Sequence, residues 1–316
     1  MLPDGYILRQ NKIIKHIGGG AFSEVFLSQN TGFTTPVALK VCKLSVDPKD
    51  KARFLKENEI LHHLHTPEAH SKIIFPLSKV DEEHPYTYYI MELADFDLDK
   101  YLNSDYDSFN DEKRIKLFQK ICDGLEHAHK KDVVHRDLWW KNALMLKERT
   151  GEYEVKLSDF GRAKDFSSID DLLSSSESPC LGHQYIRPPE SHFNILNNPS
   201  LNDYVAIDMY ALGVMLYYIF TGKPDIYYLS LQLDIATYLK QNKVNLAVLD
   251  STARLSLYKN WVDARRYKSF GLDISILDKA LNEKLNRILK KLCDIDSSKR
   301  YKNINEIKTD ISRLAL

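Results

Sequence analysis

A glycine-rich turn near the start of the chain has the composition of a phosphate-binding loop. The segment IGGGAFSEV at 17–25 lies between short alternating runs that are typical of strands. Glycine has no Cβ, so the backbone N–H groups of such a turn can approach phosphate oxygens closely. Three consecutive glycines also occur in ordinary hairpin turns, and the segment by itself leaves both interpretations open.

Three further polar motifs follow along the chain, each directly after an apolar run. They are VALK at 37–40, which ends in Lys40; VVHRDLWWKN at 133–142, which contains Asp137 and Asn142; and VKLSDFG at 155–161, which contains Asp159, Phe160 and Gly161. Any one of these motifs could arise by chance. All of them in this order, behind a glycine-rich turn, indicate a single enzyme family.

The order and spacing of these motifs resemble the eukaryotic-type protein kinase family. Gly18, Gly20 and Val25 match its G-x-G-x-x-G-x-V loop, and Ser23 stands in place of the third glycine. Serine is small enough to keep the loop close to a ligand. The resemblance extends over about residues 12–312 and implies an enzyme that uses ATP together with Mg²⁺ or Mn²⁺.

The resemblance assigns roles to the residues that would carry the chemistry. Asp137 would orient the attacking hydroxyl and accept its proton, while Asn142 and Asp159 would hold the metal ions that bridge the ATP phosphates. Lys40 would contact the α- and β-phosphates and pair with a helix glutamate. Glu57 and Glu59 are both candidates for that glutamate, and the spacing in ENEILHHL favours Glu57.

The family pattern also predicts a nucleotide pocket, in which Met91 stands behind the adenine and Asp97 reaches the ribose. A solvated surface aspartate is the alternative for Asp97. The complete set of predicted nucleotide-binding residues is Ile17, Gly18, Gly19, Gly20, Ser23, Val25, Ala38, Lys40, Met91, Glu92, Ala94, Asp97 and Leu144.

Other matches concern support and regulation. Glu190 in Pro188-Pro189-Glu190 would form a buried ion pair with Arg300, and Asp208 in IDMYALG would brace the backbone of the catalytic loop. Arg136 would bind a phosphate on the following loop. The candidate phosphorylation sites there are Ser167, Ser168, Ser174, Ser175, Ser176 and Ser178, although a Ser-rich acidic loop can also simply be solvated.

The catalytic motif departs from the pattern of Ser/Thr kinases in a way that bears on the substrate. Trp139 stands where those enzymes usually carry lysine, Trp140 follows it, and Lys141 occupies a position that is arginine in many receptor-type tyrosine kinases. We expect one tryptophan to pack internally, the other to line the substrate cleft, and Lys141 to take over the phosphate contact. The segments for peptide display are present, which favours a Ser/Thr protein substrate over a tyrosine or small-molecule substrate, or a nucleotide-binding pseudokinase scaffold.

These motifs must be positioned by elements that the sequence pattern predicts. Short alternating runs over 6–42 predict an antiparallel hairpin and a third strand, 48–65 has helical spacing, and the runs 72–80 and 86–93 predict two strands separated by the turn DEEHP. Helical patterns then cover 97–102, 111–131, 207–222 and 281–294. We expect an α+β, bilobal protein kinase fold: one kinase domain over 1–316, with a small β-rich N-lobe with one long helix (about 6–93), a hinge (about 92–97) and a larger helical C-lobe (about 98–316).

Composition limits the partners. The 316 residues contain 44 Lys plus Arg and 44 Asp plus Glu, so charge gives no reason to expect nucleic acid or a membrane surface. We find no run of about 18 apolar residues and no signal-peptide pattern. Four widely spaced cysteines favour a reducing compartment, and we expect a cytoplasmic protein, whether in its own cell or delivered to another. Oligomeric state is left open.

Overall fold

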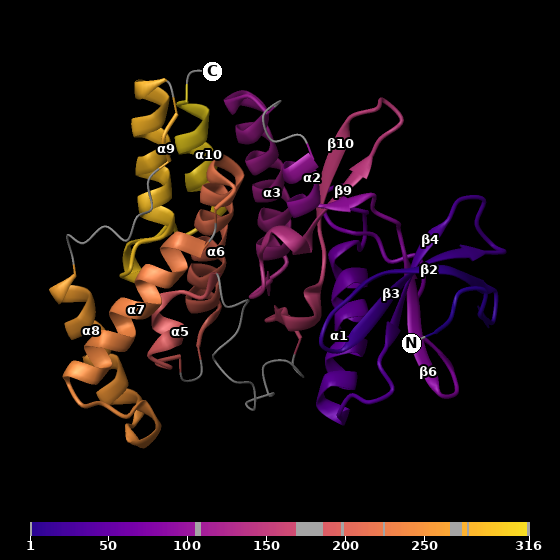
Figure 1. Ribbon diagram of the computed structural model, residues 1–316, viewed down its shortest axis with the longest axis horizontal. Coiled ribbons are helices and arrows are strands. Elements are labelled where there is room, and N and C mark those ends of the chain that lie inside the picture. The colour runs from indigo at the N-terminus through magenta and orange to yellow at the C-terminus, as the bar shows by residue number, and fades with distance from the viewer. Residues whose placement is uncertain are drawn as a thin grey trace. The chain divides into compact units, whose positions relative to one another are not determined.

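The computed structural model describes residues 2–104, 109–168, 186–196, 199–223, 225–265, 274–276 and 278–314 (Figure 1). The chain divides into two compact units. Residues 1–98 and 141–163 form the first, and residues 99–140 and 164–316 form the second. Because the segment 141–163 belongs with the N-terminal residues, the division is not a single cut in the sequence near residue 97.

The first unit is built on a six-stranded sheet with the order β1-β2-β3-β4-β6-β5. The strands are β1 (Ile7–Leu8), β2 (Asn11–Gly19), β3 (Ser23–Asn30), β4 (Val37–Cys42), β5 (Asp81–Glu83) and β6 (Tyr86–Met91). Neighbouring strands of this sheet pair antiparallel throughout. The predicted hairpin and third strand are thereby confirmed.

Side chains on one face of this sheet form its hydrophobic core. Alternate residues point to the same face of a strand, and the buried cluster accordingly takes every second residue of β4: Val37, Leu39 and Val41. Leu8, Phe26 and Ile90 join them from neighbouring strands. The intervening residues of β4, Ala38 and Lys40, must therefore face the other side, and they are buried as well.

Helix α1 (Pro48–Leu64) and a small second sheet complete the first unit. The helix begins where the Asp47 carboxylate accepts a hydrogen bond from the N–H of Asp50, with proline at the first helical position. The second sheet has the order β10-β9-β7, formed by β7 (Phe96–Asp97), β9 (Ala143–Lys147) and β10 (Tyr153–Leu157). Figure 1 shows α1 with strands β2, β3, β4 and β6.

The strand predicted over 72–80 is wrong. Only isolated bridges occur there, between Ile73 and Leu157 and between Pro76 and Met91. Pro76 has no N–H to donate to a ladder, and the N–H groups of Leu77 and Ser78 both reach the carbonyl of Ile90. The short strand β5 lies instead in the polar segment that we had predicted to be a turn.

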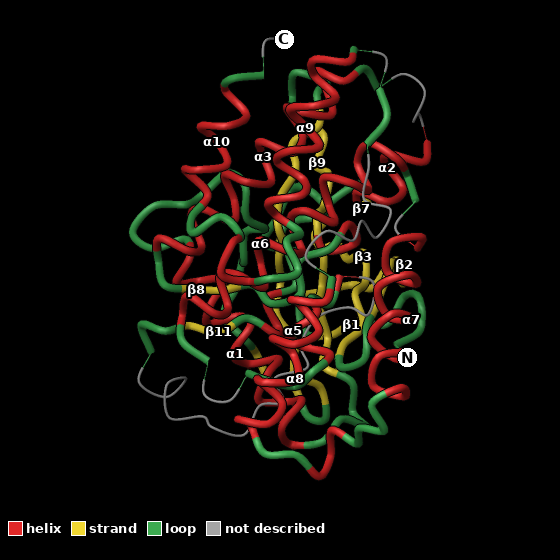
Figure 2. Tube along the Cα trace, turned by 90° about the vertical axis from the view of Figure 1, so that its left-hand side faces the viewer, coloured by secondary structure: helices red, strands yellow, loops and turns green. Residues whose placement is uncertain are grey.

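The second unit is mainly helical, as Figure 2 shows by colour. Its described helices are α2 (Leu98–Ser104), which begins at the last residue of the first unit, α3 (Asp111–Lys130), α5 (Pro189–His192), α6 (Leu201–Thr221), α7 (Asp225–Gln241), α8 (Ser251–Ala264), α9 (Lys279–Leu292) and α10 (Ile304–Ser312). Short strands β8 (Val133–Val134) and β11 (Lys164–Asp165) pair antiparallel. Single 3-10 turns lie at Trp140–Asn142, Phe160–Arg162, Leu246–Val248 and Ser297–Lys299.

The helical spacing of apolar residues in 111–131 and 281–294 predicts one apolar face on each of α3 and α9, and both faces are buried. In α3 these residues include Ile115, Phe118 and Leu125, and in α9 they are Leu281, Leu285, Ile288, Leu289 and Leu292. Within the described part of the chain, α6 is long and apolar enough to cross a membrane by length and composition alone. In its most apolar 18-residue window, 83% is buried inside the protein, as in a core helix.

Candidate functional site

Strand register in the first unit brings several predicted nucleotide-binding residues side by side. Gly18 is opposite Val25, and Val25 is opposite Lys40. Ala38 is opposite Met91 one strand further on. Cross-strand partners point to the same face of a sheet, so these residues share the face opposite the hydrophobic core.

Lys40 is the buried cation of this face. Its Nζ donates to both carboxylate oxygens of Glu57, at 2.6 and 2.7 Å, and to Oδ1 of Asp159 at 3.3 Å. Burial alone would lower the pKa of the Lys40 ammonium, but the carboxylates of Asp159 and Glu57 outweigh burial and hold this pKa well above its usual value. The lysine is therefore charged and fixed in position.

The structure distinguishes the two candidate helix glutamates. Glu57 is 3% exposed and lies against Lys40. The side chain of Glu59 is 69% exposed and approaches Lys56 at 3.6 Å. Helical geometry separates residues two positions apart by about 200° around the axis, so only one of them can face the sheet.

Asp159 and Asn142 both lie at the open end of the β9–β10 hairpin. Leu157 is opposite Ala143, and just beyond this pair the N–H of Ser158 donates to the carbonyl of Asn142 at 2.8 Å. Asp159 follows in a left-handed conformation, φ 59° and ψ 63°, with 49% of its side chain exposed. Phe160 is buried beneath α1, and Gly161 follows it.

The donor chemistry of this hairpin end fits a hard divalent cation. Magnesium is held in proteins through one or two carboxylates or amide oxygens and completes its shell with substrate phosphates and water. Asp159 and Asn142 supply a carboxylate and an amide. Among the described residues, no group of three or more His, Cys, Asp and Glu side chains could hold a metal ion.

Glu92, the first residue of the predicted hinge, is held in place by hydrogen bonds from its neighbours. The Glu92 carboxylate accepts hydrogen bonds from Lys156 Nζ, at 2.7 and 2.8 Å, and from the N–H of Phe75 at 2.6 Å. The Glu92 N–H in turn donates to the Phe75 carbonyl. The side chain and the N–H of Glu92 are therefore both engaged within the first unit.

The other predicted pocket residues are distributed around this hinge. Met91 is buried, Ala94 is half-buried, and Ile17 is 37% exposed at the end of β2. Asp97 and Leu144 are opposite each other in the β7–β9 pair. All predicted nucleotide and metal residues thus belong to the first unit.

In the second unit, Asp208 braces the segment that carries Asp137. Its carboxylate accepts hydrogen bonds from the N–H groups of His135 and Arg136, at 2.9 and 2.8 Å, and lies 2.8 Å from Nε2 of His129. Asp208 is fully buried; burial opposes ionisation, but the contacts with His129 and His135 prevail and lower its pKa. The half-buried Asp137 follows on this fixed backbone.

The two tryptophans of the loop differ in their surroundings. Trp140 is 4% exposed and stacks on Tyr218, with ring centroids 4.3 Å apart. Tyr218 in turn hydrogen-bonds Asp99. Trp139 is half-buried and meets Trp140 edge-on. Trp140 is therefore a packing residue. Trp139 and the exposed Lys141 remain the candidates for contact with a substrate.

Glu190 and Arg300 form a buried bidentate ion pair. Nη1 and Nη2 of Arg300 donate to the two Glu190 oxygens at 2.6 and 2.8 Å, and Nη1 also donates to the Ala206 carbonyl. The planar guanidinium matches the carboxylate geometry. Through Arg300, this pair ties the PPE motif to helix α6.

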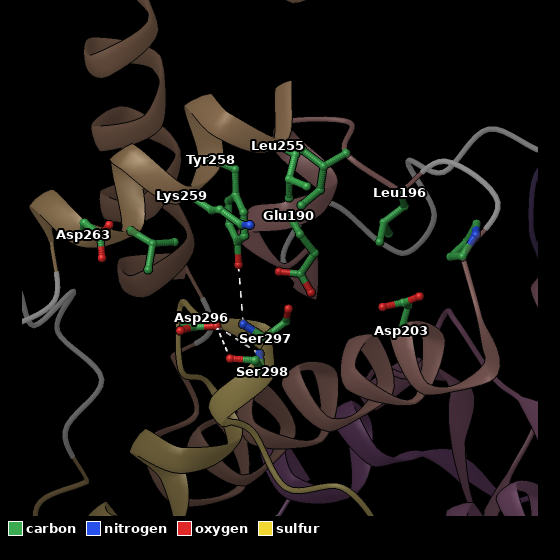
Figure 3. Close-up of a pocket in the computed structure, with 13 residues that line it drawn as sticks. Glu190, Leu196, Asp203, Leu255, Tyr258, Lys259, Asp263, Asp296, Ser297 and Ser298 are labelled. Atoms are coloured by element: carbon green, nitrogen blue, oxygen red, sulfur yellow. Dashed lines mark hydrogen bonds between the residues drawn. The ribbon is translucent and has the colours of Figure 1, made fainter. Parts of the chain in front are cut away.

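A cavity of about 480 Å³ lies beside this ion pair, lined by residues from the segment after α5, from α6, from α8 and from the turn at Ser297–Lys299 (Figure 3). Of its carboxylates, Glu190 is paired with Arg300, Asp203 accepts from the Ser200 N–H, and Asp296 accepts from the Ser298 N–H. Glu190 is the one predicted site residue in the described lining, and no ligand is assigned to this cavity.

The regulatory residues are described only in part. Ser167 and Ser168 lie in the described chain, and Ser167 Oγ donates to Asp165. Ser174, Ser175, Ser176 and Ser178 lie outside the described residues. Arg136 is 2% exposed, with its guanidinium 5.0 Å from the Tyr204 ring centre, and Lys164 Nζ is 5.9 Å from the same ring.

Two residues of the site were not predicted from the sequence. His129 is a partner of Asp208, and Lys156 holds Glu92. Lys156 and Glu92 are 64 positions apart, so no local spacing connects them. Lys156 does stand three residues before Asp159, which places it on the strand that delivers the metal candidate.

The sequence pattern of the family described as "Protein kinase domain" matches residues 11–310. A sporulation protein kinase of Schizosaccharomyces pombe is 29% identical over 71% of this chain and 39% of its own length. A probable serine/threonine-protein kinase of Lactococcus lactis is 30% identical over 67% of this chain and 31% of its own length.

A tyrosine-protein kinase transforming protein of Fujinami sarcoma virus is 31% identical over 52% of this chain and 18% of its own length. The chain thus spans between 18% and 39% of the length of these three relatives. One of the three is named a serine/threonine-protein kinase and another a tyrosine-protein kinase, so likeness alone does not decide which hydroxyl is used.

Proposed function

The chain belongs to the protein kinase domain family, and from this premise we propose that it transfers the γ-phosphoryl group of ATP to Ser or Thr hydroxyls of protein substrates. The observation that carries the proposal is the contact of Lys40 with both Glu57 and Asp159, at 2.6 and 3.3 Å. It joins a phosphate-binding cation, its helix partner and a metal candidate within one compact unit.

The proposed reaction is an in-line displacement in which positioning and charge neutralisation supply most of the catalysis. Lys40, held by two carboxylates, neutralises the α- and β-phosphates. A magnesium or manganese ion held by Asn142 and Asp159 would supply further positive charge at the phosphates when bound. Asp137 orients the substrate hydroxyl and accepts its proton as the hydroxyl oxygen bonds to phosphorus, and ADP leaves.

A protein substrate is favoured by the Glu190–Arg300 pair, which fixes the PPE motif to α6. A tyrosine substrate is the second candidate, because Trp139 replaces the lysine usual in Ser/Thr kinases and the viral relative is named a tyrosine-protein kinase. Intact Lys40, Asp137, Asn142 and Asp159 support catalysis over a scaffold role.

The proposed function is tested by incubating the purified chain with Mg-ATP and a mixture of Ser-, Thr- and Tyr-containing peptides. Mass spectrometry then identifies each residue that has gained a phosphate. Phosphoserine or phosphothreonine in the products is expected. Phosphotyrosine alone would replace the proposal with the second candidate, and no phosphate on any product would refute turnover.

We also propose that phosphorylation within 167–178 raises activity, with Arg136 and Lys164 receiving the phosphate. The support is that both cations lie at the Tyr204 ring. Alanine at all six candidate serines should then lower the specific activity several-fold. Unchanged activity would refute this regulation and leave the catalytic proposal standing.

A reducing cytoplasm is the proposed site of action, since Cys42, Cys122 and Cys293 are buried free thiols.

A further inference from the structure

Gly19 is unexplained by the resemblance, which requires glycine at 18 and 20 but accepts any residue between them. The structure gives a local reason. A Cβ on Gly19 would lie 3.0 Å from Cδ of Glu24 and closer still to its Oε2, and 3.1 Å from the Ser23 carbonyl. At Gly18 and Gly20 an added Cβ would meet nothing within 4 Å. Gly19 thus makes room for the Glu24 carboxylate.

The Glu24 carboxylate is held over Gly19 from both sides. Oε2 lies 2.6 Å from Nε2 of His16, and Oε1 lies 3.1 Å from Nζ of Lys43. Burial opposes ionisation of this group, but hydrogen bonds from Lys43 and His16 prevail and lower the pKa of Glu24. Its negative charge is therefore matched by cationic or polar partners and does not stand alone beside a predicted phosphate site.

Lys43 makes further contacts with the turn itself. Its Nζ donates to the Gly20 carbonyl at 2.6 Å, and its backbone N–H donates to the Phe22 carbonyl at 2.9 Å. The Gly20 N–H closes the turn on the Ser23 carbonyl at 2.9 Å. One residue just beyond the end of β4 thus fastens the glycine-rich turn through both its side chain and its backbone.

We propose that His16, Glu24 and Lys43 form a latch that holds the glycine-rich turn in the shape required to bind the phosphates of ATP. Glycine has the greatest backbone freedom of any residue, so ordering three of them on binding costs conformational entropy. A latch that orders the turn beforehand reduces this cost. The three latch residues are positioning residues, and the proposal rests on the ATP-dependent activity proposed above.

The latch is tested by comparing the affinities of Lys43→Met and wild-type protein for Mg-ATP and for adenosine, using calorimetry. Loss of the latch should weaken ATP about tenfold, equivalent to about 1.4 kcal/mol, and change adenosine by less than about twofold, because adenosine has no phosphates. In turnover, KM for ATP should rise while kcat changes by less than about twofold. Lys43→Arg, which keeps the charge, should recover part of the affinity.

Lys51→Met is the matched control, because Lys51 also forms a lysine–glutamate pair in this unit, with Glu82 at 3.0 Å, but on an exposed surface. It should leave both affinities unchanged. Equal ATP affinity in Lys43→Met and wild type would overturn the latch. An equal loss for ATP and adenosine would also overturn it, because that would indicate general damage to the pocket.

A double-mutant cycle gives a second readout. Gly19→Ala should weaken ATP binding in the wild-type background, because the new methyl group displaces the Glu24 carboxylate, and should have a much smaller effect once Glu24→Ala has already removed it. Additive effects would contradict the latch. A wild-type chain that binds neither ATP nor adenosine would refute the proposed function together with the latch, whereas wild-type binding with unaltered variants refutes the latch alone.

Discussion

At the scale of single residues, the least expected feature in purely physical terms is a buried lysine. Burying an isolated ammonium is very costly, and the cost falls only when the charge is paired and hydrogen-bonded. Lys40 is 7% exposed and satisfies this condition through Glu57 and Asp159. Lys40 lies on β4, next to the glycine-rich hairpin, and a fixed, charged lysine in this place is suited to binding a polyanion.

Asp159→Asn tests the metal assignment. The variant removes one charge but retains a residue that tolerates the left-handed backbone at φ 59°. The thermal shift produced by Mg-ATP should be largely lost, because the metal loses its carboxylate. Asp159 also contacts the buried Lys40, but Glu57 still pairs with that lysine in the variant, so the free energy of unfolding of the unliganded protein should fall by about 1 kcal/mol. A retained shift would place the metal elsewhere.

His192 gives a prediction about pH. Burial, helped by the neighbouring Arg187, lowers the pKa of His192 to about 4, whereas an unfolded histidine titrates near pH 6.5. Above about pH 6.5 His192 is neutral in both the folded and the unfolded protein, so the free energy of unfolding does not depend on its titration there. The free energy of unfolding then falls as the pH drops toward 4, at up to about 1.4 kcal/mol per pH unit.

His192→Gln should flatten this part of the stability profile. Urea unfolding at pH 7, 6 and 5 would measure it: the variant should lose less free energy of unfolding than wild type over that interval. Parallel profiles for the two proteins would show that His192 does not titrate as its burial implies.

At the scale of elements, the pairing of α1 with β4 decides whether Lys40 is held in position. Glu57→Gln should lower kcat/KM for ATP by about a hundredfold, because a misplaced cation no longer meets the phosphates. Glu59→Gln is the matched control two residues away on the same helix, exposed to solvent, and should change activity by less than about twofold. Equal effects of the two substitutions, measured by steady-state kinetics, would show that α1 does not act through Glu57.

Elements with a clear period could be predicted from the sequence, and those shaped by distant partners could not. The apolar faces of α3 and α9 follow 3.6-residue spacing and are buried as predicted. The segment 72–80 is apolar enough for a strand, but its hydrogen bonds go to Leu157 and Ile90 instead of a regular neighbour. An apolar sequence indicates that a segment is buried. It does not indicate which backbone groups the segment will hydrogen-bond.

The same limit applies to the site. The motif residues, and the choice of Glu57 over Glu59, could be predicted because family spacing is local in sequence. The pairing of Glu92 with Lys156 and the stacking of Trp140 on Tyr218 depend on segments more than sixty positions apart. The distant Tyr218 decides which of the two adjacent tryptophans is buried, and no local pattern in the sequence indicates this partner.

At the scale of the whole molecule, the predicted nucleotide and metal residues belong to the first unit, and Asp137 belongs to the second. The chain passes from one to the other between Trp140 and Lys141, inside the motif that carries Asp137 and Asn142. On each side the motif is fixed internally: Asp208 holds the backbone before Asp137, and Ser158 holds Asn142.

The stability of the second unit should depend on its buried ion pair. Arg300→Met leaves the Glu190 carboxylate buried without its partner and should lower the free energy of unfolding by about 3–5 kcal/mol. Lys116→Met breaks an exposed pair with Glu112 and should cost less than about 1 kcal/mol. Urea denaturation of both variants would measure the difference, and similar small losses would contradict the anchoring role of Arg300.

The most direct test of the central claim compares wild-type protein with Asp137→Asn in one assay, using ATP labelled in its γ-phosphate and a protein substrate in the presence of Mg²⁺. Wild type should transfer the label, and the variant should do so about 10²–10⁴-fold more slowly while binding Mg-ATP with unchanged affinity. If the variant transfers the label at the wild-type rate, or if the wild-type protein binds Mg-ATP and transfers none, the chain does not catalyse phosphoryl transfer through Asp137.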